Sequence, residues 1–144
     1  MLNSPFFQYR RAQAETADPG ELVAMLYRGG IRFLQRALLA LKESDYQTAN
    51  ANLIRAEDVL SELNTTLNPS AGDLAVNLAR IYDYAYWRLV EANCRKDALI
   101  VEEVLGILQD LLPAWEEAVR RIRQARLAGI APSYAISGTG SAAG

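Results

Sequence analysis

Apolar positions along the chain recur in steps of three and four residues over four segments, and short polar breaks separate these segments. Such spacing places side chains on one side of an α-helix. We therefore expect helices over about residues 19–41, 46–67, 73–94 and 98–127. The second segment shows the pattern most regularly, with an apolar stripe of Tyr46, Ala49, Leu53, Ala56, Leu60, Leu63 and Leu67.

The breaks carry residues that typically start a helix. Asp18 precedes Pro19, which suits the first helical position, and Asp45 and Asp97 stand directly before the second and fourth segments. An aspartate at such a position accepts hydrogen bonds from the first free backbone N–H groups of the helix. Residues 68–72 contain Asn, Pro, Ser and Gly, which favour a turn.

Four helices joined by such short connections have to run antiparallel to their sequential neighbours. The pattern therefore predicts an all-α protein, an antiparallel up-down-up-down four-helix bundle formed by residues 18–127. Residues 1–17 are expected to form a flexible N-terminal arm. Residues 128–144 are rich in small residues and glycine, and we expect them to form a flexible C-terminal tail.

The first helical segment carries more apolar surface than a bundle core requires. At about 100° per residue, its side chains form two stripes about a third of a turn apart. The polar residues, including Arg28 and Arg32, lie opposite. One stripe contains Leu22, Leu26, Phe33 and Ala37, and the other contains Val23, Tyr27, Ile31, Leu34 and Leu38.

The third segment shows a similar excess. Tyr86, Trp87 and Val90 fall on one shoulder of its core stripe, whereas Tyr84 falls near the other. Surface aromatic residues are typical anchors of protein interfaces. Three interpretations remain open from the pattern: the first helix is simply the most buried one, the surplus surface forms a groove that binds an amphipathic helix, or it mediates self-association.

Composition narrows the possible functions. The chain of 144 residues has a net charge of −2, one cysteine and no histidine. The charge does not favour nucleic acid as a partner. Without histidine, we expect no enzyme, no metal site and no cofactor. A single cysteine suits a reducing compartment, and we see neither a signal peptide nor a membrane-length apolar run, so we expect a cytoplasmic protein.

Three motifs identify the chain as similar to a known family. Residues 16–31 read TADPGELVAMLYRGGI, residues 62–68 read ELNTTLN, and residues 78–84 and 88–93 read LARIYDY and RLVEAN. In order and spacing they resemble the FliS family of flagellar export chaperones. The resemblance covers about residues 9–123. It departs from the family pattern at Arg28, where an acidic residue is usual, at Gly30, where alanine is usual, and at Pro113, which should kink the last helix.

The resemblance implies a function and a partner. A protein of this family would bind the disordered C-terminal segment of flagellin, prevent its premature polymerisation and aid its delivery to the flagellar type III export gate. Tyr9 stands where the family carries a tyrosine in its N-terminal arm. Combining the resemblance with the surplus apolar positions, we expect the flagellin-binding residues to be Tyr9, Tyr27, Ile31, Leu34, Tyr86, Trp87 and Val90.

Overall fold

The structure, a computed structural model, describes residues 19–68, 70 and 72–129. Within these residues the chain forms four α-helices and no strands. The helices are α2 (Pro19–Lys42), α3 (Tyr46–Thr65), α4 (Asp73–Arg95) and α5 (Ala98–Leu127). The predicted all-α class is confirmed, and none of these helices is long and apolar enough to cross a membrane.

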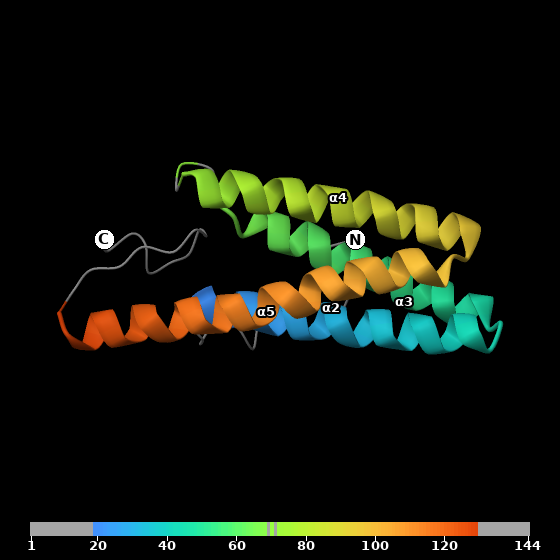
Figure 1. Ribbon diagram of the computed structural model, residues 1–144, viewed down its shortest axis with the longest axis horizontal. Helices are drawn as coiled ribbons and strands as arrows, with labels where there is room; N and C mark the ends of the chain where they lie inside the picture. The colour runs from blue at the N-terminus through green and yellow to red at the C-terminus, as the bar shows by residue number, and fades with distance from the viewer. Residues whose placement is uncertain (1–18, 69, 71, 130–144) are drawn as a thin grey trace.

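The helices form an antiparallel bundle (Figure 1). Helices α2 and α4 run in one direction, and α3 and α5 run back between them. Helix α2 packs against α3 and α5, and α4 packs against the same two helices, most weakly against α5. This arrangement confirms the predicted four-helix bundle. The predicted N-terminal arm, and the tail from residue 130 onward, lie outside the described residues.

Two of the expected caps are present. An Asp45 side-chain oxygen accepts a hydrogen bond from the Thr48 N–H at the start of α3, and Asp97 accepts one from the Leu99 N–H at the start of α5. Helix α4 ends at Arg95, and its C-cap residue, Lys96, adopts a left-handed conformation with φ of 52°. Asp18, the expected cap of the first helix, lies outside the described residues.

Helix α5 continues through Pro113 as one element of 30 residues. Proline at this position removes the hydrogen bond to the Gln109 carbonyl. Both residues are on the exposed side of the helix. Water can therefore reach that carbonyl and replace the lost hydrogen bond.

The other two departures from the family pattern, Arg28 and Gly30, both lie at contacts between helices. Arg28 donates a hydrogen bond to Glu116 of α5 over 2.8 Å, which ties α2 to α5. Gly30 is buried at a close approach of three helices. A Cβ atom there would stand 3.0 Å from Leu108 of α5 and 3.2 Å from Val59 of α3.

Candidate functional site

Most of the surplus apolar surface of α2 is buried by the chain itself. Tyr27 has an exposed fraction of 1% and Leu34 of 0%. Phe33 and Ala37, which belong to the other stripe, are also buried. Both stripes therefore serve the core, and the prediction that Tyr27 and Leu34 contact a partner is corrected: neither side chain is accessible from the surface.

Tyr27 has a polar partner in the core. Its hydroxyl lies 2.5 Å from that of Tyr82 on α4, so the two residues join the diagonally opposed helices of the bundle. Burial raises the pKa of both hydroxyls above the ordinary value for tyrosine. One hydroxyl donates to the other, so each buried oxygen has a hydrogen-bond partner, which makes their burial tolerable.

Helix α4 leaves its surplus apolar surface open. Trp87 is 60% exposed, and its indole packs edge-on against the Tyr86 ring with centroids 5.2 Å apart. Tyr84 is also exposed, but it lies on the other flank, where its hydroxyl donates to Glu103 of α5. The expected division of the aromatic residues between two shoulders is therefore present.

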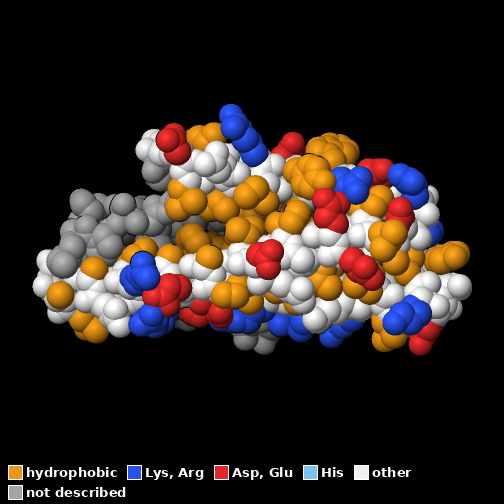
Figure 2. Space-filling model, viewed as in Figure 1, with side chains coloured by type: hydrophobic (Ala, Val, Ile, Leu, Met, Phe, Trp, Pro, Cys, Tyr) orange, Lys and Arg blue, Asp and Glu red, His pale blue; other side chains and the backbone are white. Residues whose placement is uncertain are grey.

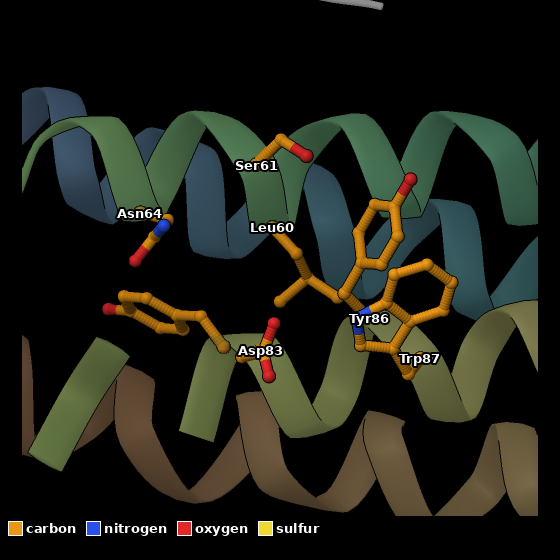
Figure 3. Close-up of a pocket in the computed structure, with 7 residues that line it drawn as sticks. Leu60, Ser61, Asn64, Asp83, Tyr86 and Trp87 are labelled. Atoms are coloured by element: carbon orange, nitrogen blue, oxygen red, sulfur yellow. The ribbon is translucent and has the colours of Figure 1, made fainter. Parts of the chain in front are cut away.

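A hollow of about 190 Å³ lies between α3 and α4 beside these aromatic residues (Figure 3). Leu60 and the Tyr82 ring belong to the core, so they form its floor. Tyr86 and Trp87 rise from α4 on one side, and α3 supplies the facing wall. The complete lining is Leu60, Ser61, Asn64, Tyr82, Asp83, Tyr86 and Trp87.

A second hollow of about 540 Å³ continues along the same two helices toward the α3–α4 connection. It shares Asn64 and Asp83 with the first, so the two form one furrow. We call it the α3–α4 furrow. From Ala75 to Trp87 it follows α4 for about 18 Å, enough for about three turns of a bound helix. The second hollow is lined by Asn64, Leu67, Ala75, Val76, Ala79, Arg80 and Asp83.

The opposite flank of α4 is held to α5 by charged groups. Arg88 donates to Glu103 of α5 over 2.9 Å and to Glu91 of its own helix over 2.7 Å. The hydrogen bond from Tyr84 is the largest cause of a lowered pKa at the Glu103 carboxyl, and the hydrogen bond from Arg88 lowers that pKa further. Figure 2 shows hydrophobic side chains gathered along the line between α4 and α5. Helix α4 thus has apolar surface on both flanks, but the furrow lies on the α3 side.

The remaining expected site residues have different positions. Val90 is half-buried on α4, one turn beyond Tyr86 and Trp87. Ile31 is partly buried and packs against the core from α2, so it does not line the furrow. Tyr9 lies outside the described residues. The structure therefore brings together Tyr86 and Trp87, with Val90 nearby.

Sequence reasoning missed the polar lining of the furrow. Asn64 comes from α3, and Arg80 and Asp83 come from α4. All three lie within the recognised motifs, but no periodicity distinguishes a charge beside a furrow from one in open water. Among residues 19–68, 70 and 72–129, no group of three or more His, Cys, Asp or Glu side chains is placed to hold a metal ion.

Comparison with known proteins places the chain in a family. The family model described as "Flagellar protein FliS" matches residues 2–122. The flagellar secretion chaperone FliS of Bacillus subtilis is 38% identical over 125 residues, which cover 87% of this chain and 93% of that protein. The Salmonella typhimurium protein of the same name is 36% identical, over 71% of this chain and 77% of its own length. The chain therefore belongs to the FliS family of flagellar proteins.

Proposed function

We propose that this protein is a cytoplasmic flagellar secretion chaperone whose cargo is the disordered C-terminal segment of flagellin. It holds that segment, prevents premature polymerisation and presents it to the flagellar type III export apparatus. The curated relatives named above are flagellar secretion chaperones, which supports the role in export. The observation that supports the binding mode is the α3–α4 furrow with the exposed Trp87 at its rim.

The furrow suits a helix that forms on binding. Its floor is apolar, and its length accommodates about three helical turns. A disordered segment with an apolar stripe can cover that floor as an amphipathic helix. Ordering the segment costs conformational entropy, so the affinity for each unit of buried area is moderate. Moderate affinity suits a cargo that has to be released for export.

Trp87 and Tyr86 are the proposed anchors of the cargo helix. Large aromatic side chains remove much apolar area from water and lose little rotamer entropy. Val90 extends the same flank of α4 by one turn, and we retain it as a contact. Ile31 stays a prediction on a different face, and Tyr9 stays a prediction for the N-terminal arm.

The first test is calorimetric titration of the full chain with the C-terminal segment of the flagellin from the same host. The Trp87→Glu variant should bind at least about tenfold more weakly, because it removes a rim anchor and places a charge against apolar cargo. Leu39→Glu is the matched control, since Leu39 is 57% exposed on α2, away from the furrow. Equal affinity of the Trp87 variant and the parent would contradict the proposed site.

Removal of residues 1–9 tests the arm separately. If Tyr9 lies over the binding surface or contacts cargo, the deletion changes the affinity for the flagellin segment. Unchanged binding in the same titration would remove the arm from the proposal and leave the furrow in place.

Self-association is the competing use of the open flank of α4. A second copy packed on Trp87 would make the isolated protein a dimer, and Trp87→Glu would convert it to a monomer. Light scattering before and after addition of the flagellin segment distinguishes the two functions. The chaperone proposal expects a monomer that forms a one-to-one complex.

A further inference from the structure

We infer that Arg80 and Asp83 select the cargo helix by charge and fix its register in the α3–α4 furrow. The helix that fits carries an acidic side chain facing Arg80 and a basic side chain about one turn away facing Asp83. This inference rests on the proposed function, since the occupant is the flagellin C-terminal segment. It adds a requirement that the apolar floor of the furrow does not impose.

The two charges lie at defined points along the furrow. Arg80 lines only the hollow nearer the α3–α4 connection, whereas Asp83 lines both hollows and so marks their junction. They stand three positions apart on α4, so they share a face of the helix at a rise of about 4.5 Å. Across the furrow at the same junction stands Asn64 of α3.

These charges are uncompensated within the part of the chain that the structure describes. Neither Arg80 nor Asp83 forms an ion pair or a side-chain hydrogen bond there, although their spacing on α4 would permit one. The other two arginines of the same helix behave differently. Arg88 pairs with Glu91 and Glu103, and Arg95 pairs with Glu91.

A helix that covers the furrow changes the solvation free energy of the Arg80 guanidinium and the Asp83 carboxylate. In the free protein, water solvates the exposed guanidinium and carboxylate. A bound helix displaces part of that water, and a charge that then lacks a partner carries a desolvation cost. Cargo that supplies opposite charges at the two points avoids the cost, whereas an amphipathic helix with apolar or like-charged groups there does not. Arg80 and Asp83 therefore weaken the binding of segments with unsuitable charges more than they strengthen the binding of the matching segment.

Charge reversal of the chaperone provides the test. We expect Arg80→Glu and Asp83→Lys each to weaken binding of the flagellin segment about fivefold at low salt, with a smaller loss at high salt. Arg36→Glu is the matched control. Arg36 is exposed on α2 and also lacks an ion pair among the described residues, but it does not line the furrow. Its reversal should leave the affinity within about twofold of the parent.

Charge reversals in the flagellin segment test whether particular cargo residues face Arg80 and Asp83. Each acidic residue of the flagellin segment is changed to lysine in turn and titrated against the Arg80→Glu variant. One position should restore affinity to near the parent value, while the same cargo change weakens binding to the unmodified protein. A single basic-to-glutamate change about one turn away should do the same for Asp83→Lys. Matched rescue at two such positions supports the register that we infer.

The failures are distinguishable. If Trp87→Glu abolishes binding but the Arg80 and Asp83 reversals bind as well as the parent, the charge selection is overturned and the proposed function stands. If Arg36→Glu loses as much affinity as Arg80→Glu, a general charge effect explains the data and the selection is again overturned. If the unmodified protein does not bind the segment, the proposed function and this inference both fail.

Discussion

Helices α2 and α4 have nearly the same length and both carry surplus apolar residues, but they differ in how much of their surface the bundle buries. Eleven of the 24 residues of α2 are buried, against six of the 23 residues of α4. Helix α2 packs closely on both neighbours, while α4 packs weakly on α5 and leaves its furrow open toward α3. Surplus apolar surface therefore indicates a binding face only where the neighbouring helices fail to cover it.

The physical cause of the difference lies in the middle of α2. Gly30 has no side chain to separate the helices, so Val59 of α3 and Leu108 of α5 lie close to its backbone. Close approach closes the core over both stripes. Helix α4 has the bulky Tyr86 and Trp87 at the corresponding shoulder, and above the buried Leu60 the facing wall of α3 consists of the small polar Ser61 and Asn64. A hollow remains between the helices there, and the Trp87 ring stays at the surface.

The largest expected effect is in the core of α2. Leu34→Ala removes a side chain that is 0% exposed and should lower the free energy of unfolding by about 3 kcal/mol. Urea denaturation followed by circular dichroism measures it. Leu39→Ala, on the same helix but 57% exposed, is the control and should change little. Equal effects of the two variants would mean that the second stripe of α2 is not sealed.

The next effect concerns the hydroxyl pair that joins α2 to α4. Tyr27→Phe or Tyr82→Phe alone leaves one buried hydroxyl without its partner and should cost about 1–2 kcal/mol of stability. The double variant should recover part of that loss, because no orphaned hydroxyl remains. Additive losses in a double-mutant cycle would show that the two hydroxyls are not coupled.

A smaller effect tests the close approach at Gly30. Gly30→Ala gains helix propensity, but its Cβ meets Leu108 and Val59 at 3.0 and 3.2 Å, so we expect a net loss of about 1 kcal/mol. Gly106→Ala in α5 is the matched control. Nothing stands within 4 Å of its added Cβ, and the variant should gain about 0.5 kcal/mol or more. Thermal unfolding of both variants gives the comparison, and stabilisation by Gly30→Ala would contradict the account of α2.

The smallest stability effect belongs to α4. Trp87→Ala should shift the free energy of unfolding by less than about 0.5 kcal/mol, because the side chain is mostly in water. The same variant should lose affinity for the flagellin segment. A large loss of stability would place Trp87 among the core residues and remove the difference between the two helices.

The sequence predicted the fold because its signals are local. Asp45 and Asp97 are cap residues by chemistry, and spacing in threes and fours needs no knowledge of neighbours. Local sequence signals do not determine which apolar stripe of a helix faces outward, because this depends on how closely the other helices approach. The signal that was present is Gly30: a glycine inside a helix costs stability unless packing requires it. Gly30 marks a close approach of α2 to both α3 and α5.

Trp87 offers the most direct measurement of the central claim, that cargo covers the open furrow of α4. The chain has two tryptophans, and Trp115 is 9% exposed. In a Trp115→Phe variant, checked for folding by circular dichroism, fluorescence reports Trp87 alone. Addition of the flagellin C-terminal segment should shift its emission to shorter wavelengths and reduce quenching by acrylamide. Calorimetrically confirmed binding that leaves both the emission and the quenching of Trp87 unchanged would contradict the account.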